Sequence, residues 1–133
     1  MTFLVGAFLA AHGLIHASYL SPSPRTAGGP DWPFTLTDSW LVTFAHLDPG
    51  LVRALGAAIV TTTVILFVGA GLATVGWLVP HAWWASLVVG GAVASLATIA
   101  LFFHPWLVLG LAIDLVLLWA VVVNGWEVGG VGA

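Results

Sequence analysis

Long apolar runs dominate this chain, and one long and two short polar segments separate them. The runs occupy residues 2–20, 51–77, 81–103 and 106–124. Each is long enough to cross a bilayer core of roughly 30 Å, which takes about 20 residues of helix. Because the runs are continuous, they lack the short alternating segments of a transmembrane β-barrel. The pattern predicts an all-α integral membrane protein, a four-helix transmembrane bundle in which residues 1–133 form a single domain.

Proline residues mark where three of the four helices begin. Pro49 follows Asp48, a residue type that caps helix N-termini, and Pro80 and Pro105 precede the third and fourth runs. Proline suits the first turn because the N–H that it lacks has no partner there in any case. The links at Pro80 and Pro105 are only a few residues long, which predicts that helices two, three and four are antiparallel neighbours.

The segment 21–49 is the one long connection. It starts with a stretch rich in Pro, Ser and Gly, which predicts irregular structure. The residues Thr37, Asp38 and Ser39 are placed to cap a short helix that carries the apolar side chains of Trp40, Leu41, Phe44 and Leu47. We expect this helix to lie in the membrane interface, so that an interfacial loop joins the first two transmembrane helices.

The two Arg residues give a prediction of orientation. Arg25 and Arg53 both lie on the side of the long loop, and positive residues favour the cytoplasmic side of a membrane. The loop is therefore predicted to be cytoplasmic and both termini to lie on the opposite side. No basic residue precedes Arg25, so the first run lacks the start of a signal peptide and is expected to be retained.

Composition supports the membrane assignment and excludes several classes of function. Only 5% of the 133 residues are charged, against about 25% in soluble domains, which excludes a soluble globular protein. Two basic residues cannot neutralise enough phosphates for nucleic-acid binding. The chain has no Cys, so it forms neither disulfides nor thiolate metal sites. The partner that composition does predict is the lipid bilayer.

Small residues recur at helical spacing in the predicted spans. The third run has them at every fourth position, flanked by two more, and the first run has a shorter series: Ser86, Gly90, Ala94 and Thr98 with Gly91 and Ser95, and Gly6 with Ala10. Such patterns let helices approach closely. Packing within the bundle is the predicted role, and a dimer face is the alternative. No Ser–His–Asp arrangement is predicted, because we expect no His at the depth of Ser86 or Ser95.

Three ionisable residues lie inside the apolar runs: His12, His16 and Asp114. Such residues cost a few kcal/mol in a membrane, so they face the bundle interior and have partners. Depths follow from a rise of about 1.5 Å per residue, counted from Leu20 and Pro105 at the loop-side edge. His16 lies about 6 Å deep, His12 about 12 Å and Asp114 about 13 Å. His12 and Asp114 are therefore predicted to lie at nearly equal depth.

The first chemical hypothesis is a metal site. His12 and His16 are four residues apart, which places both imidazoles on one helical face. Asp114 would complete a set of two imidazoles and one carboxylate, which suits iron or zinc. Gly13 follows His12 where zinc proteases have Glu, so that protease motif is absent.

A b-type haem is a second hypothesis for the same half of the molecule. His16 and His104 are available as axial ligands from two helices, with Arg25 and Arg53 near the propionates. A third hypothesis is purely structural, in which His12 and Asp114 hydrogen-bond and hold the first and fourth helices together. A fourth is a proton or substrate pathway, because intramembrane acids and His often form relays.

These hypotheses predict different functions. The metal and haem hypotheses predict a small membrane subunit that binds a metal or haem and acts in a redox or metal-handling process. The structural hypothesis predicts a non-enzymatic accessory or structural subunit of a larger membrane complex. The pathway hypothesis predicts a proton-coupled transporter component, which would need a homo-oligomer to enclose a path. We identify no catalytic residue in the sequence.

Overall fold

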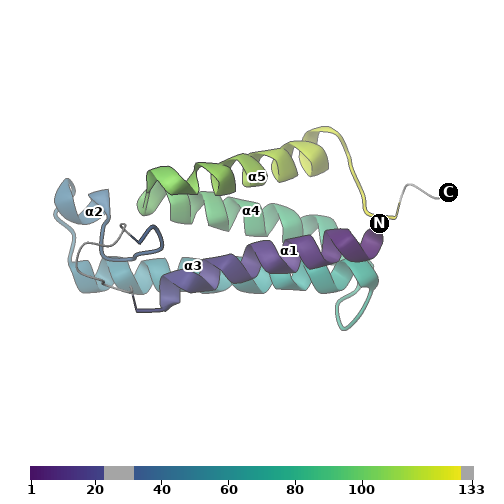
Figure 1. Cartoon of the computed structure of the whole chain (residues 1–133), viewed down its shortest axis with the longest axis horizontal. Helices are drawn as coiled ribbons and strands as arrows, with labels where there is room; N and C mark the ends of the chain where they lie inside the picture. The colour runs from purple at the N-terminus through teal and green to yellow at the C-terminus, as the bar shows by residue number, and fades with distance from the viewer. Residues whose placement is uncertain (23–31, 130–133) are drawn as a thin grey trace.

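Four long helices run side by side along the molecule in a computed structural model that describes residues 1–22 and 32–129 (Figure 1). They are α1 (Thr2–His16), α3 (Pro49–Val75), α4 (Trp84–Leu101) and α5 (Val108–Leu118). Short turns extend three of them: η1 (Ala17–Leu20) follows α1, η2 (His81–Trp83) precedes α4, η3 (Pro105–Leu107) precedes α5 and the π-helical η4 (Trp119–Val123) follows it. The described residues contain no strand.

The four helices with their flanking turns are long and apolar enough to cross a membrane. These spans are Thr2–Leu20, Pro49–Val75, His81–Leu101 and Pro105–Val123. Every boundary lies within two residues of the one predicted from the sequence. Successive helices alternate in direction, so the start of α1 and the end of η4 lie at the same end of the molecule (Figure 1). The prediction of four antiparallel apolar helices is confirmed.

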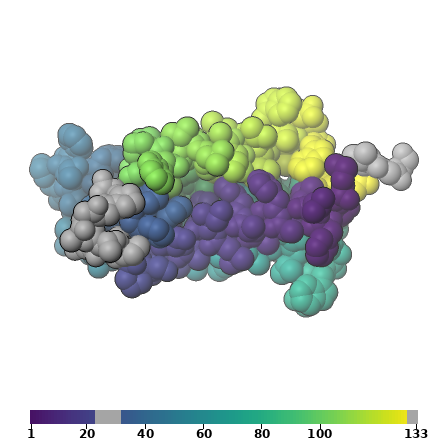
Figure 2. Space-filling model, in the orientation of Figure 1, coloured from purple at the N-terminus to yellow at the C-terminus, as the bar shows by residue number. Residues whose placement is uncertain are grey.

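The helices are arranged as an arc that starts at α1 and ends at α5. α1 packs mainly on α3, α3 on α4, and α4 on α5. The space-filling view shows α1 and α5 running along the same face of the molecule (Figure 2). Between them lies an open apolar groove of about 230 Å³, whose lining residues are Phe8 on α1 and Ala112, Ile113, Val116 and Leu117 on α5. This seam between α1 and α5 is thus open, and the two helices pack mainly on α3 and on α4 instead of on each other.

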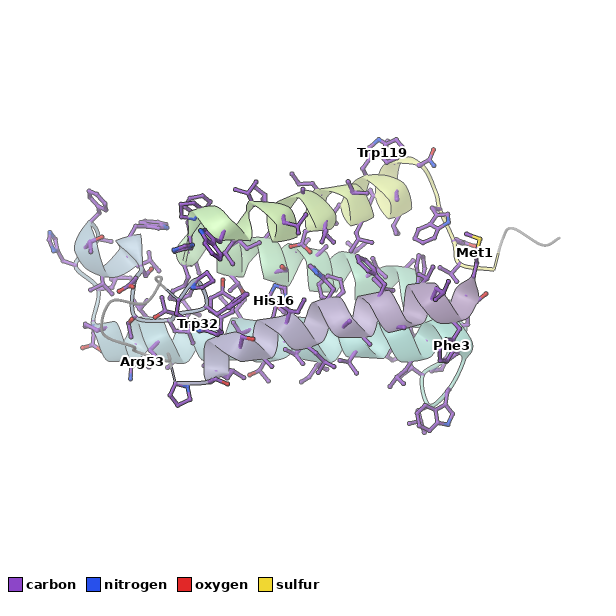
Figure 3. All side chains as sticks on the ribbon, viewed as in Figure 1. Met1, Phe3, His16, Trp32, Arg53 and Trp119 are labelled. Atoms are coloured by element: carbon purple, nitrogen blue, oxygen red, sulfur yellow. The ribbon has the colours of Figure 1, made fainter. Side chains whose placement is uncertain are left out.

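Apolar side chains cover most of the outside of the bundle, and the ionisable side chains of the transmembrane helices lie inside it. Phe3 and Trp119 are on the outer surface, 76% and 57% exposed, whereas His16 lies within the bundle (Figure 3). Thr63 and Asp114 are also fully buried. This distribution is the reverse of that in soluble proteins, where charged groups are mostly exposed. It is the distribution expected when the surrounding solvent is lipid, and it indicates an integral membrane protein.

The long connection contains one short helix, α2 (Trp40–Thr43). Its predicted capping segment is confirmed, because the Ser39 hydroxyl accepts from the backbone N–H of Leu41. The Ser39 hydroxyl also donates to the carbonyl of Leu101 at 2.7 Å, and the Trp40 indole donates to the carbonyl of Ala100 at 2.8 Å. These bonds fasten α2 to the end of α4. Its location in a membrane interface stays a prediction.

Glycines allow α1 and α3 to touch along their backbones. A Cβ added at Gly71 would lie 2.6 Å from the carbonyl oxygen of Gly6, and one added at Gly6 would lie 2.9 Å from the carbonyl oxygen of Gly71. A Cβ at Gly13 would lie 2.6 Å from the Cβ of Phe67. Close backbone approach of this kind replaces the hydrophobic effect as the force between helices in lipid. The predicted packing role of the small residues in the first helix is confirmed.

The small-residue series of the third span does not face the interior as a whole. Ser86, its first member, is exposed, whereas Gly91, Ser95 and Thr98 are buried. The buried face of α4 is set by Trp84 and by the residues that follow it at helical spacing. The inner face therefore passes through the flanking residues of the predicted series, which puts Ser95 in the centre of the bundle.

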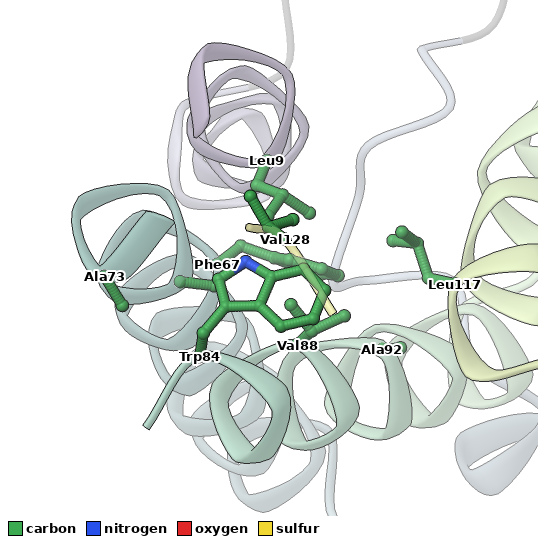
Figure 4. Close-up of a cluster of buried hydrophobic side chains, with 9 residues drawn as sticks. Leu9, Phe67, Ala73, Trp84, Val88, Ala92, Leu117 and Val128 are labelled. Carbon is green, nitrogen blue, oxygen red and sulfur yellow. The ribbon is translucent and has the colours of Figure 1, made fainter. Parts of the chain in front are cut away.

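Two apolar clusters lie on either side of a central polar layer. The cluster near the chain termini contains Leu9, Phe67, Ala70, Ala73, Trp84, Val88, Ala92, Leu117 and Val128 (Figure 4). The cluster near the long loop contains Tyr19, Leu36, Val52, Val60, Ile99, Phe102 and Leu107. Apart from Thr74, the buried polar residues of the long helices fall between members of the two clusters: His12, His16, Thr63, Ser95, Thr98 and Asp114. The polar layer is thus separated from both ends of the bundle by apolar side chains.

The contact between α1 and α3 gives a first test. Gly71→Ala forces a Cβ against the Gly6 backbone, and such overpacking costs about 1–3 kcal/mol. Gly69→Ala is the matched control on the same helix, because its Cβ would meet Leu87 at an ordinary 3.6 Å. Unfolding free energies in mixed detergent micelles should fall for Gly71→Ala and stay level or rise for Gly69→Ala. Equal effects would show that the close approach does not limit the packing.

Candidate functional site

Four side chains from three helices meet in the central polar layer. His12 and His16 lie one turn apart on the inner face of α1, Ser95 on α4 and Asp114 on α5. Both imidazoles are 6% exposed, and Ser95 and Asp114 are 0% exposed. The pairing of His12 with Asp114 agrees with the equal depth predicted for them.

Hydrogen bonds join the four residues in a continuous network. His12 donates from Nε2 to Asp114 Oδ1 at 2.9 Å. The other carboxyl oxygen, Asp114 Oδ2, lies 2.5 Å from Ser95 Oγ, and Ser95 Oγ lies 2.7 Å from His16 Nε2. His16 Nδ1 donates to the backbone carbonyl of His12 at 3.0 Å. The network therefore starts and ends on His12, at its side chain and at its backbone.

The donors and acceptors of this network fix how many protons it holds. A carbonyl oxygen only accepts, so the proton of the bond between His16 and His12 belongs to His16 Nδ1. A neutral His16 then has a lone pair at Nε2, and Ser95 has one hydroxyl proton for both His16 and Asp114. The four bonds need four protons, but two neutral imidazoles and one hydroxyl supply three. With Asp114 ionised, the network is one proton short.

Adding one proton completes the network in either of two ways. In one arrangement Asp114 is protonated and donates to Ser95, which donates to His16. In the other, Asp114 is a carboxylate that accepts from Ser95, and His16 is an imidazolium that donates to Ser95. Both arrangements have a net charge of zero. Without the additional proton the network would carry a buried negative charge and two facing lone pairs, which is costly in an apolar interior.

Aromatic rings enclose the imidazoles. The Phe67 ring meets the His12 ring edge to face, with 4.8 Å between centroids, and the Phe8 ring stacks on His12 at 6.1 Å. Phe67 also lies beside His16, at 6.4 Å. Phe67 is fully buried, so it sets apolar surface against both imidazoles, and such low-dielectric surroundings strengthen hydrogen bonds.

Other hydroxyl groups of the transmembrane helices do not join the network. Five Thr hydroxyls donate to the carbonyl four residues earlier on their own helix: Thr61, Thr62, Thr63, Thr74 and Thr98. This back-bonding is common for Thr in helices and satisfies the hydroxyl locally. Ser95 differs, because its hydroxyl bonds side chains of two other helices.

Ser95 is the site residue that sequence reasoning missed. We expected no His at its depth, and that expectation was wrong, because His16 lies 2.7 Å from its hydroxyl. The depth count that matched His12 to Asp114 would have found it. Ser95 is eight residues before Phe103, the loop-side end of the third predicted span, which places it about 12 Å deep. The long side chain of His16 reaches back along α1 to this level.

The proposed metal ligands are brought together, but as hydrogen-bonding partners. Among the described residues, no group of three or more His, Cys, Asp or Glu is arranged to hold a metal ion. Three of the four imidazole nitrogens of His12 and His16 are hydrogen-bonded, and so are both oxygens of Asp114. A metal at this place would have to displace these bonds. The arrangement favours proton chemistry over metal ligation.

The residues proposed for haem are not joined to one another by any contact in the described part of the chain. His104 lies in the link between α4 and α5, where its Nδ1 accepts from the backbone N–H of Trp106 at 3.2 Å. No hydrogen bond or ring contact joins His104 to His16. Arg53 is exposed in the first turn of α3 and pairs with none of the described residues (Figure 3). Arg25 lies outside the described residues.

Comparison with known proteins gives this chain no family. No family model, no curated protein and no solved structure matches it. The chemistry of the buried network is therefore the basis for a functional proposal.

The bond between His12 and Asp114 can be measured with a double-mutant cycle. His12→Leu and Asp114→Leu each leave a buried partner unpaired, whereas the double variant removes both groups. We expect a coupling energy of about 0.6 kcal/mol, the average for hydrogen bonds between membrane helices. Unfolding in mixed detergent micelles provides the free energies.

A matched cycle provides the control. Thr98→Val removes a hydroxyl that bonds its own helix at Ala94, so its effect should add to that of His12→Leu within about 0.5 kcal/mol. If the effects of His12→Leu and Asp114→Leu on the unfolding free energy add in the same way, their hydrogen bond contributes nothing to the association of α1 and α5.

Proposed function

We propose that this chain is a small integral membrane protein that binds one proton at the centre of its bundle and acts as a component of a proton-coupled membrane process. The observation that carries the proposal is the proton count of the network. Its four hydrogen bonds are complete only when it holds one proton more than neutral imidazoles and a carboxylate supply. A proton is therefore the ligand that fits this site.

The position of the network supports the proposal. Intramembrane Asp and His residues are costly and commonly form proton relays in pumps and transporters. Here the network is closed off by one apolar cluster toward the termini and by another toward the long loop. Such a site corresponds to an occluded proton. Release to either side requires a conformational change, for which the open groove between α1 and α5 offers space.

The proposal includes the assembly and orientation expected from the sequence. A bundle of 133 residues whose centre is occluded needs a second copy of the chain or a larger membrane complex to form a complete path. Arg53 at the loop side favours a cytoplasmic long loop, with the start of α1 on the opposite side.

A structural accessory role is the second candidate, and a specific observation favours it. α1 packs mainly on α3, and α5 mainly on α4, so the hydrogen bond from His12 to Asp114 is a polar tie across the open seam. In this role the additional proton is permanently bound, and the network holds the helices for assembly with other subunits.

A metal- or haem-binding subunit is the weaker proposal, because the donor atoms are already hydrogen-bonded to each other. Elemental analysis and an absorption spectrum of the purified protein test it. A stoichiometric metal or a haem band that is lost in His16→Ala would replace the proton proposal with this one.

Proton binding can be measured by difference titration of the purified protein. Asp114→Asn supplies an amide N–H toward Ser95 and keeps a carbonyl oxygen toward His12, so it satisfies all four bonds without an additional proton. We expect the wild type to release one proton per chain that Asp114→Asn does not release. Measurement with a pH indicator in weak buffer gives the number directly.

The control is Asp48→Asn, which removes the exposed carboxylate that caps α3. Asp48 takes no part in the network, so this variant should release the same network proton as the wild type. Curves of the wild type and Asp114→Asn that superimpose would overturn the proposal. A proton that is never released cannot be coupled to any process, and the structural role would then stand.

Proton movement across a bilayer is a separate expectation. In vesicles with a trapped pH-sensitive dye, the wild type should speed the decay of an imposed pH gradient. With Asp114→Asn the gradient should decay at the rate of empty vesicles, because this variant has no proton to release. With Asp48→Asn it should decay as with the wild type. A wild-type rate equal to that of empty vesicles would contradict transport by the chain alone.

A further inference from the structure

We propose that Ser95 passes the bound proton between Asp114 and His16. The inference rests on the proposed function, since it concerns the same proton. Ser95 Oγ lies 2.5 Å from Asp114 Oδ2 and 2.7 Å from His16 Nε2, and the residue is completely buried. A hydroxyl both donates and accepts, so it can take a proton from one neighbour while it gives its own to the other.

The transfer balances without any further reactant. It starts with Asp114 protonated, its Oδ2–H donating to Ser95 Oγ and the Ser95 hydroxyl donating to His16 Nε2. The Oδ2–H bond breaks as a new O–H bond forms on Ser95, and the original Ser95 O–H bond breaks as an N–H bond forms at His16 Nε2. The products are a carboxylate, an unchanged Ser95 and an imidazolium. No electron is transferred, and the net charge of the network stays zero.

His12 stabilises the charges that form at both ends of this relay. Its side chain donates from Nε2 to Asp114 Oδ1, which favours the carboxylate. Its backbone carbonyl accepts from His16 Nδ1, which favours the imidazolium. All four hydrogen bonds exist before and after the transfer, and no side chain has to leave its place. Hydrogen bonds to ionised groups are about twice as strong as neutral ones, which offsets the separation of charge.

The relay assigns a specific role to a hydroxyl that could otherwise be a packing group. Thr98 lies on the same helix, is equally buried and bonds only its own helix at Ala94. Removal of either hydroxyl makes a small cavity, but only the removal of Ser95 breaks the path between Asp114 and His16. The pair of residues therefore separates proton transfer from packing.

Nuclear magnetic resonance of the protein in bilayers tests the relay. With ¹⁵N in His and ¹³C in the Asp side chains, the wild type should give signals of His16 Nε2 and Asp114 Cγ that are averaged between protonated and unprotonated positions. Ser95→Ala should give one fixed form of each group, and its proton exchange after a pH jump should be roughly 100-fold slower. Ser95→Thr keeps the hydroxyl and should restore averaging, and Thr98→Val should leave it unchanged.

Two outcomes would overturn the relay. One is averaging that persists in Ser95→Ala, and the other is a wild type with unaveraged signals at every temperature. The wild-type measurement needs no variant, so it decides the question even if Ser95→Ala does not fold. The difference titration of Asp114→Asn is independent of these signals. A released proton without averaging would overturn the relay alone, whereas the absence of a released proton would overturn the proposed function as well.

Discussion

The lack of water in a bilayer interior is the constraint on which this structure depends. Asp114 lies in the middle of an apolar helix, so its carboxyl group must find all of its partners inside the protein. The partners come from α1 and α4, so both helices must present these side chains toward Asp114. His12 must face Asp114 on α5, His16 must face Ser95 on α4, and Ser95 must face both α1 and α5. One buried carboxyl group thus links three helices.

The packing of α1 on α3 is what lets the network form. With Gly6 against Gly71 and Gly13 against Phe67, the two helices approach until their backbones touch. This contact carries both imidazoles into the centre, where Phe67 covers them. The apolar clusters on either side then close the site. The small residues on one side of α1 therefore support the polar residues on another. The glycines set the distance between α1 and α3, and that distance places the imidazoles within reach of their hydrogen-bonding partners.

The parts of this structure that the sequence predicts are those that depend on one helix at a time. Span positions follow from length and hydropathy, and the equal depth of His12 and Asp114 follows from the rise per residue. The rotation of α4 does not follow, because it depends on how Trp84 and the residues after it pack against other helices. This is why Ser95 was assigned to a packing series instead of to the site. The spacing of His12 and His16 shows that both can face one partner, but it does not show which nitrogen is engaged, and that distinction separates a metal ligand from a hydrogen-bonding group.

The choice of an acid at position 114 bears on whether the network is structural or functional. An Asn there would accept from His12 and donate to Ser95, so it would satisfy the same four hydrogen bonds with no group that ionises. Helix association would then need no proton and would be independent of pH. With Asp, the same four bonds form only while the network holds an additional proton. Loss of that proton leaves a buried negative charge, which is costly. For a structural tie this is a disadvantage, whereas for a site that binds and releases a proton it is the property that allows the function.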